Sequence, residues 1–189
     1  WSVFFFLCTV GLCSGPVAVL SAQTYIHRNI TTDHGLPQSQ VTALLRDTKG
    51  YLWIGMLGGL ARWDGNNFKT ILHEDGSSLG GIRALHENTQ GRIFAGTNGK
   101  GVLEIVGNHA LAGDTRRRLP DASVRTIASD AYGALWVGTD KGLVRFNQAV
   151  LDSSSSQVFL KDMVISDVKT YDDKIYVGCF DNGLYEFRN

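Results

Sequence analysis

An all-β fold built from repeated four-stranded sheets is predicted by three features of this sequence. A similar segment occurs four times, as VTALLRDTKGYLWIG, IRALHENTQGRIFAG, VRTIASDAYGALWVG and ISDVKTYDDKIYVG. The copies begin at Val41, Ile82, Val124 and Ile165, so they lie 41, 42 and 41 residues apart. Short runs rich in β-branched and aromatic residues alternate with glycine-containing turns, and no helical period persists. Four short antiparallel strands repeated roughly every 40 to 50 residues are typical of propeller blades.

Each repeat begins with an apolar-rich first strand, which spans residues 41–46 in the first copy. A turn of the form Asp-x-x-Gly or Asn-x-x-Gly follows in three copies, at residues 47–50, 88–91 and 130–133. The side chain at its first position can accept backbone hydrogen bonds, and the glycine supplies the positive φ that a short hairpin loop needs. The fourth copy is one residue shorter, at residues 172–174, so we expect a tighter hairpin there.

The second strand carries an aromatic residue two positions before a glycine in every copy. Both faces of a propeller sheet pack on neighbouring sheets, so we expect these aromatic side chains in the core, where each removes roughly 150–250 Å² from water. We expect the glycines to serve the backbone conformation at the end of a strand rather than phosphate binding, because no helix follows them to form a phosphate-binding turn. The aromatic residues are Trp53, Phe94, Trp136 and Tyr176, and the glycines are Gly55, Gly96, Gly138 and Gly178.

A third strand and a weaker fourth strand complete each repeat. The third strands are expected at residues 60–64, 102–106, 143–147 and 184–188, and the fourth at 68–72, 109–112 and 158–161. Blades are therefore expected near residues 41–72, 82–112, 124–161 and 165–189. Residues 25–32 are similar to a fourth strand without its first three, so we expect an outer strand there that closes a ring. About four four-stranded antiparallel blades form either an arc of a longer propeller, which we favour, or an unusually small ring.

The first 22 residues are expected to be a secretory signal peptide. Residues 1–22 carry no charge, hold the apolar run Val3–Leu7 and end in a small-residue cleavage site at Ser21-Ala22, although a positive n-region is missing. An uncleaved membrane anchor is the alternative, because about 20 apolar residues can span a bilayer. Residues 23–189 then hold the propeller repeats, and Cys179 is their only cysteine, so we expect no internal disulfide.

The composition points away from nucleic-acid binding and from catalysis. Basic and acidic residues balance at 18 each, so electrostatic capture of nucleic acid is not indicated. The five histidines have no metal-ligand spacing, and no nucleophile elbow or phosphate-binding loop is present. We therefore expect no catalytic residues, no metal site and no cofactor.

The first strand of each blade lines the central channel of a propeller, so its opening residues are candidates for ligand binding. Arg83 and Arg125 hold equivalent positions in adjacent repeats, where Thr42 and Ser166 are smaller, and Gln40 opens the first repeat. One interpretation is that the two arginines and Gln40 face a shared pocket and hold a polar or anionic ligand. The alternative is that the arginines only solvate a wet channel.

Two segments carry a family likeness. GLPQSQVTALLRDTKGYLWIGMLGGLARWDGNNF, at residues 35–68, resembles a two-component regulator propeller repeat, whose general form is G-L-P-x-x-x-V-x-x-x-x-x-D-x-x-G-x-L-W-I-G-x-x-x-G-L-x-R-x-D. LPDASVRTIASDAYGALWVGTDKGLVRFN, at residues 119–147, matches this form nearly as well. The second repeat departs from it in having Phe94 instead of tryptophan, and the fourth in its shorter hairpin and Tyr176.

The resemblance implies a partial arc of a seven-bladed propeller and a role in signalling. Members of this family are periplasmic sensor regions of inner-membrane proteins, with a histidine kinase, hybrid kinase or diguanylate cyclase as the output. It therefore implies an extracytoplasmic, non-enzymatic input region that binds a small polar ligand such as an oligosaccharide, in a homodimeric full-length protein. The alternatives are a secreted protein-interaction scaffold and a streptogramin-lyase-like enzyme. Such an enzyme needs a histidine base, and only His86 and His109 lie well inside the repeats.

Overall fold

The computed structural model of this chain describes residues 26–112, 115, 118–147 and 156–188. The expected signal peptide at residues 1–22 lies outside them. The elements of the described residues are strands, joined by turns, and one short 3-10 helix, η1 (Thr32–His34), so the all-β prediction is confirmed. No helix among them is long and apolar enough to cross a membrane. The strands are β1 (Val41–Arg46), β2 (Leu52–Met56), β3 (Gly59–Trp63), β4 (Phe68–His73), β5 (Ile82–Glu87), β6 (Ile93–Thr97), β7 (Val102–Val106), β8 (His109–Ala112), β9 (Val124–Ser129), β10 (Leu135–Thr139), β11 (Gly142–Phe146), β12 (Ser156–Phe159), β13 (Ile165–Tyr171), β14 (Lys174–Cys179) and β15 (Gly183–Arg188).

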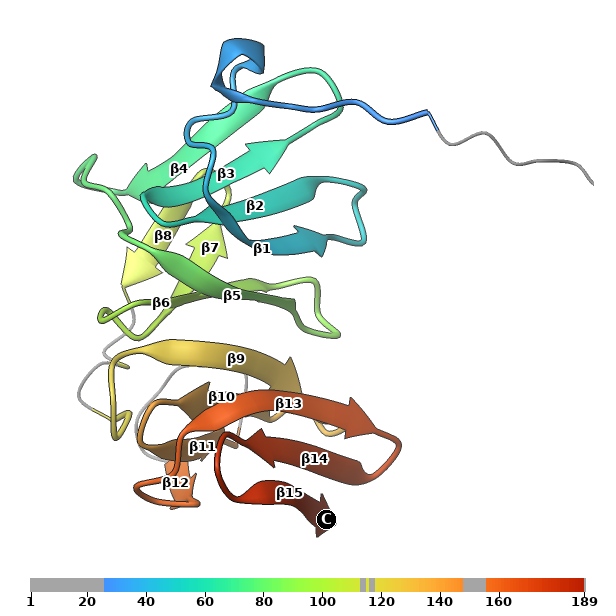
Figure 1. Cartoon of the computed structure of the whole chain (residues 1–189), viewed down its shortest axis with the longest axis vertical. Coiled ribbons are helices and arrows are strands. Elements are labelled where there is room, and N and C mark those ends of the chain that lie inside the picture. Colours follow the sequence, from blue (N-terminus) through green and yellow to red (C-terminus); the bar gives the residue numbers. More distant parts are fainter. Residues whose placement is uncertain (1–25, 113–114, 116–117, 148–155, 189) are drawn as a thin grey trace, which may run out of the picture.

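The strands form four antiparallel blades, each ordered as in the sequence. Blade 1 contains β1–β4, blade 2 β5–β8, blade 3 β9–β12 and blade 4 β13–β15. The first strands of neighbouring blades contact one another, so β1, β5, β9 and β13 follow one another along the molecule (Figure 1). This arrangement confirms the prediction of propeller blades, with three strands in the described part of blade 4.

The hairpin between the first two strands of each blade depends on the turn residues that the sequence pattern indicates. Gly50, Gly91 and Gly133 close the three longer turns with φ of 90°, 74° and 82°. In blade 4, Tyr171 pairs with Lys174 and Asp172 takes a φ of 53°, so the loop contains only two residues. Short loops of this kind need positive φ values, which asparagine, aspartate and glycine adopt most readily. The expected tighter hairpin is therefore confirmed.

In blades 1 to 3, the glycine two positions after the aromatic residue has a different role from the one expected. Gly96 lies inside β6, and its φ is not among the positive values, so no special backbone conformation requires it. A Cβ atom there would lie 2.5 Å from Cγ1 of Val124, the first residue of the next blade. The glycine is a notch that receives the β-branched residue of the neighbouring blade. The other notches pair Gly55 with Ile82 and Gly138 with Ile165, at 2.8 Å and 2.6 Å.

Three of the four aromatic residues lie in the core as expected. Trp53, Phe94 and Trp136 are no more than 3% exposed. Tyr176 is only half-buried, which corrects the expectation for blade 4. The reason is that β15, which pairs with the strand carrying Tyr176, is exposed at alternate positions, so less of the sheet is covered.

The buried tryptophans are held by the turn carboxylates. Asp47 accepts hydrogen bonds from the Tyr51 backbone N–H and from the indole Nε1–H of Trp53, both at 2.8 Å. Asp130 repeats the arrangement in blade 3, with the Ala134 N–H at 2.8 Å and Trp136 Nε1 at 3.0 Å. The turn residue therefore fixes both the hairpin and the core side chain of its blade.

Two features of the fold were not expected. The outer strands β4 and β8 pair in parallel at Leu72–His109 and His73–Ala110, and this joins blades 1 and 2 into one eight-stranded sheet. The outer strand expected at residues 25–32 is wrong, because residues 26–31 form no strand and Thr32 begins η1. A strand needs a hydrogen-bonding partner, and the free edge of β15 lies at the opposite end of the molecule (Figure 1).

Candidate ligand-binding site

A β-bulge distorts the start of the first strand in each blade. The register shift leaves Thr42, Arg83, Arg125 and Ser166 without a partner on the second strand of their blades. A bulge leaves one residue unpaired and re-aims its side chain, and bulges often occur next to functional sites. The two arginines therefore share a conformation set by the backbone, in blades that lie side by side.

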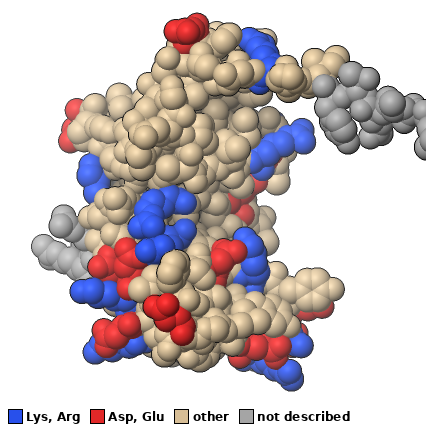
Figure 2. Space-filling view, viewed as in Figure 1, with Lys and Arg blue, Asp and Glu red and all other residues tan. Residues whose placement is uncertain are grey.

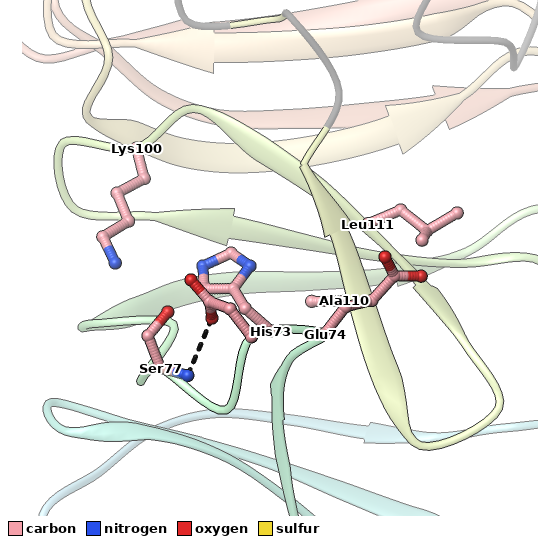
Figure 3. A pocket seen from close by; sticks show the side chains of 7 residues that line it. His73, Glu74, Ser77, Lys100, Ala110 and Leu111 are labelled. Atoms are coloured by element: carbon pink, nitrogen blue, oxygen red, sulfur yellow. Dashed lines mark hydrogen bonds between the residues drawn. The ribbon is translucent and has the colours of Figure 1, made fainter.

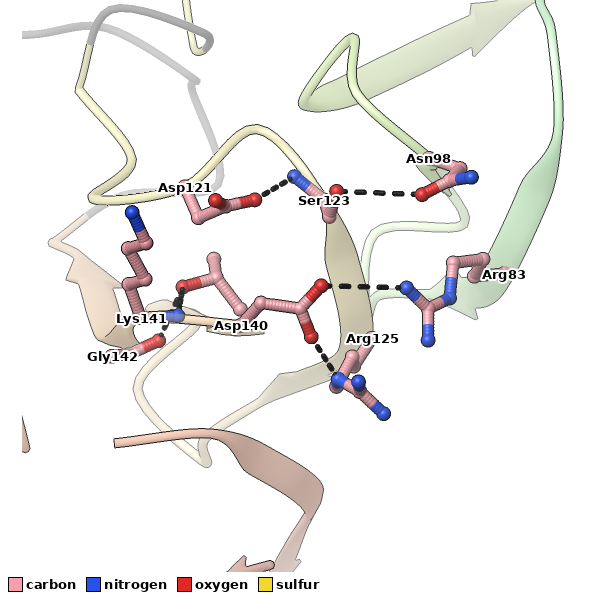
Figure 4. Close-up of polar contacts among 9 residues, drawn as sticks. Arg83, Asn98, Asp121, Ser123, Arg125, Asp140, Lys141 and Gly142 are labelled. Atoms are coloured by element: carbon pink, nitrogen blue, oxygen red, sulfur yellow. Dashed lines mark hydrogen bonds and ion pairs between the residues drawn. The ribbon is translucent and has the colours of Figure 1, made fainter. Parts of the chain in front are cut away.

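Arg83 and Arg125 converge on one carboxylate. Asp140, in the turn between β10 and β11, accepts from Nε of Arg125 within its own blade. Its other oxygen lies 3.6 Å from Nη1 of Arg83, across the boundary between blades 2 and 3 (Figure 4). The two arginines thus approach each other at Asp140, a residue that the sequence pattern does not single out, and their expected role in ligand binding stays a prediction.

A hydroxyl, an amide and a second carboxylate border this cluster. Ser123 donates its hydroxyl hydrogen to the side-chain oxygen of Asn98 at 3.3 Å, and its backbone N–H donates to Asp121 at 2.7 Å. An isolated bridge between Asn98 and Ser123 joins the loops that carry them. Figure 4 shows these groups on the same rim as the arginine pair. Hydroxyl and amide groups beside two guanidinium groups suit a polar ligand.

The cluster has an excess of positive charge at the surface. Two guanidinium groups face one carboxylate, and all three side chains are about 30% exposed, at 30%, 29% and 31%. Figure 2 shows lysine and arginine atoms gathered at mid-height of the face on which the first strands lie, with acidic atoms beside them. Ion pairs exposed to this degree are weak and are screened by salt.

Gln40 does not join the arginine cluster. Its side chain is exposed, and its backbone carbonyl accepts a hydrogen bond from Leu57 N–H at 3.3 Å within blade 1. No hydrogen bond or ion pair in the described part of the chain connects it with Arg83 or Arg125. Its expected role in ligand binding stays a prediction.

The histidines and the cysteine show no arrangement for catalysis in the residues that the structure describes. His86 Nε2 lies 2.8 Å from the Ser129 hydroxyl, between β5 and β9, and burial lowers the pKa of this imidazole. Burial likewise raises the pKa of the Cys179 thiol, which makes it a poor nucleophile. No group of three or more potential metal ligands occurs in the described ranges.

A separate groove lies at the junction of β4 and β8 (Figure 3). It encloses about 730 Å³ and is open to solvent. Hydrogen bonds from Ser77 lower the pKa of Asp75, and Lys100 Nζ donates to the Ser78 carbonyl at 2.9 Å. The groove shares no residue with the arginine cluster, so the two are separate features of the surface. The lining residues are His73, Glu74, Asp75, Ser77, Lys100, Ala110 and Leu111.

A sequence signal for Asp140 exists but depends on strand pairing. In an antiparallel hairpin the end of the second strand lies beside the start of the first, and Thr139 pairs with Val124. A residue directly after the second strand is therefore brought close to Arg125. The repeat has Leu57, Asn98, Asp140 and Phe180 at this position. Only blade 3 has an acid there, so the pattern of the repeat as a whole does not single it out.

The fold and this site define an all-β propeller-type protein with a polar surface on its first strands. Residues 35–58 and 118–141 match the model of the family described as two component regulator propeller. These are two segments whose sequence resembles that repeat, so the resemblance is confirmed for them. No curated protein matches the sequence significantly.

Solved structures share this fold at low sequence identity. The extracellular domain of the hybrid two component system BT3049 from B. thetaiotaomicron aligns with a TM-score of 0.71 and 19% identity, over 89% of this chain and 24% of its own. The extracellular domain of BT4673 from the same organism aligns with a TM-score of 0.66 and 21% identity, over 82% of this chain and 22% of its own. Virginiamycin B lyase from Staphylococcus aureus aligns with a TM-score of 0.58 and 11% identity, and the alignment covers 77% of this chain and 50% of the lyase. This chain spans about a quarter of the length of the two B. thetaiotaomicron structures.

Proposed function

We propose that this chain is part of the ligand-sensing input region of an extracytoplasmic bacterial signalling protein. The family match supports a sensor-type propeller, and two structural relatives are extracellular domains of two-component and one-component systems. The output is a histidine kinase or a diguanylate cyclase outside these residues, the protein is anchored in the inner membrane, and it acts as a homodimer. The segment itself is not an enzyme.

The ligand is a small polar molecule such as an oligosaccharide, bound at Arg83 and Arg125. The observation that carries this proposal is that both arginines occupy bulge positions on adjacent first strands and turn toward one point. Guanidinium groups present several N–H donors in a fixed plane, which suits oxygen-rich ligands. The two guanidinium groups lie on different blades, so they can hold one ligand only at a particular relative position of blades 2 and 3. Ligand binding is therefore coupled to how these two blades are placed.

Calorimetric titration of an oligosaccharide panel tests the proposal. The full-length protein is expected to bind at least one member, and the variant with Arg83→Ala and Arg125→Ala is expected to lose that binding. Lys69→Ala, which removes one exposed positive charge from the outer strand β4, is the matched control and keeps it. Equal affinity in the double variant and the parent would exclude the arginine site. The coding region after Asn189 tests the output: a transmembrane helix followed by a kinase or cyclase domain is expected.

A lyase activity is supported only by the fold that this chain shares with virginiamycin B lyase. His86, the better placed of the two histidines, is engaged with Ser129 rather than with a second histidine or a carboxylate. Turnover of a streptogramin that depends on magnesium and is lost in His86→Ala would establish the enzyme in place of the sensor. A secreted scaffold would show neither this turnover nor saccharide binding.

A further inference from the structure

We propose that Asp140 occupies the place of an anionic ligand group, so that the site between Arg83 and Arg125 takes a small molecule that carries a carboxylate or a sulfate. This inference rests on the proposed function and specifies the ligand class of the same site. A ligand anion would replace the Asp140 carboxylate between the two guanidinium groups. Without ligand, Asp140 neutralises part of the positive charge of the two arginines, and it competes with the ligand anion for them.

The charges of the cluster favour an anion over a neutral ligand. Both guanidinium groups are paired with Asp140 alone among the described residues, one through Arg125 Nε and one through Arg83 Nη1 at 3.6 Å. The two arginines and Asp140 carry a formal charge of +1, and the charges of Lys141 and Asp121 beside them cancel (Figure 4). Each guanidinium has five N–H groups, so most of its donors are available to an incoming oxyanion. Arginine pairs with carboxylate and with sulfate-like oxyanions through two parallel hydrogen bonds, which adds geometric selectivity.

Asp140 can be displaced without unfolding its turn. The turn between β10 and β11 is held by Thr139, whose hydroxyl donates to the Gly142 carbonyl at 2.8 Å and accepts from Lys141 N–H at 3.2 Å. Neither hydrogen bond uses the Asp140 carboxylate, which is 31% exposed. Its side chain can therefore rotate into solvent while the backbone stays in place. Exposed ion pairs of this kind are weak, so displacement needs little free energy.

The neighbouring groups favour an acidic sugar over a bare anion. Ser123 and the Asn98 amide border the arginines on the loops that enter the same rim (Figure 4). Hydroxyl and amide groups can donate to and accept from sugar hydroxyls. A uronic acid presents both features, because its carboxylate lies on a ring that carries several hydroxyl groups. The arginine pair would bind the carboxylate, and the Asn98–Ser123 edge would contact the ring.

Titrations of the full-length protein with sodium sulfate, galacturonic acid and neutral galactose test this inference. We expect sulfate and galacturonic acid to bind and to shift the NMR signals of the arginine Nε–H groups, at an ionic strength held constant with sodium chloride. Galactose is expected to bind much more weakly. Asp140→Asn removes the competing charge but keeps the side-chain shape, and should raise the affinity for both anions about fivefold. Arg83→Ala and Arg125→Ala should each lower it, whereas Lys69→Ala should leave it unchanged.

The outcomes separate this inference from the proposed function. If a neutral oligosaccharide binds through the arginines while Asp140→Asn changes nothing, the sensor proposal stands and the anionic ligand is wrong. If neither anion shifts the arginine signals of the unmodified protein, the inference is also overturned, and this result does not depend on whether a variant folds. If galacturonic acid binds no better than galactose, the site is not selective for an acidic group. Tighter anion binding by Asp140→Asn supports the displacement.

Discussion

Each core aromatic residue is matched to the chemistry of its own turn residue. The two buried tryptophans, Trp53 and Trp136, donate their indole N–H to Asp47 and Asp130. Blade 2 has phenylalanine, which has no donor, and its turn residue is the neutral Asn88. Asn88 keeps only the backbone hydrogen bonds of the turn, from Gln90 and Arg92 N–H. A buried carboxylate occurs where an indole needs an acceptor, because an unpaired buried charge is strongly destabilising.

Trp53→Phe is expected to destabilise the protein by more than its loss of volume explains. The substitution removes the indole donor and leaves one oxygen of the buried Asp47 without this partner. A buried acceptor left unsatisfied costs about 1–3 kcal/mol. Adding Asp47→Asn recreates the pair found in blade 2 and should restore part of the stability. Urea unfolding of the two single variants and the double variant gives the coupling free energy, and simple additivity would contradict the matching of the two residues.

The reciprocal change in blade 2 is expected to be unfavourable in the same way. Asn88→Asp places a carboxylate at a site that is 4% exposed, beside Phe94, which cannot donate to it. We expect a loss of about 1–3 kcal/mol in the free energy of unfolding. The control is Asn67→Asp, a change of the same chemistry in an exposed turn. An equal loss in both variants would show that added negative charge, rather than burial without a donor, causes the effect.

At the scale of the element, the glycine notch determines how one blade meets the next. The β-branched residue that begins a blade fills the space above the glycine of the preceding second strand, as Val124 does above Gly96. The two positions recur together in the sequence because each is the steric complement of the other. This packing explains why the repeat conserves both its Val or Ile start and its glycine within one chain.

Gly96→Ala should destabilise the interface between blades 2 and 3. The new Cβ would lie 2.5 Å from Val124 Cγ1 and 3.1 Å from Ala84 Cβ, so buried atoms must move. Overpacking of this kind costs typically about 1–3 kcal/mol. Val124→Ala added to Gly96→Ala should cost less than the sum of the single changes, as measured by thermal unfolding. Val106→Ala, at a valine that is 52% exposed, is the control and should have little effect alone or in combination.

The strands were predictable from the sequence, whereas several contacts between them were not. Alternating apolar residues and the turn residues at 47–50, 88–91 and 130–133 indicate where strands begin and end. The pairing of β4 with β8 was not predictable, because it depends on two outer strands with no recurring pattern. The failure at residues 25–32 has a related cause: strand-like composition is insufficient where no edge is available for pairing. The bulges at Arg83 and Arg125 were likewise not predictable from the pattern of apolar residues.

At the scale of the whole molecule, the site was predictable only in part. The equivalence of Arg83 and Arg125 follows from the repeat, and first strands line the channel in any propeller. The contribution of Asp140 depends on which loop the hairpin brings to that rim and on how blade 3 faces blade 2. Polar contacts across blade boundaries are specific to each pair of blades, as with Thr48 and Glu87 between blades 1 and 2. Such contacts are not part of the pattern that the repeats share, so the repeat pattern does not predict them.

The boundary between blades 2 and 3 should make the stability of the molecule depend on pH. Burial lowers the pKa of His86 below the ordinary 6.5, and Lys169 acts in the same direction, whereas Glu87 opposes them. A histidine whose pKa is lower in the folded state takes up its proton more readily when unfolded, so its contribution is complete above pH 6.5 and is lost as the pH falls toward the folded pKa. Protonation also constrains the hydrogen bond to Ser129, since both ring nitrogens then become donors.

Urea unfolding between pH 7.5 and 5 should therefore show a decline in stability that is smaller in His86→Gln. Replacing the exposed His109 in the same way is the control, and an identical decline in His86→Gln and the parent would place the pH dependence elsewhere.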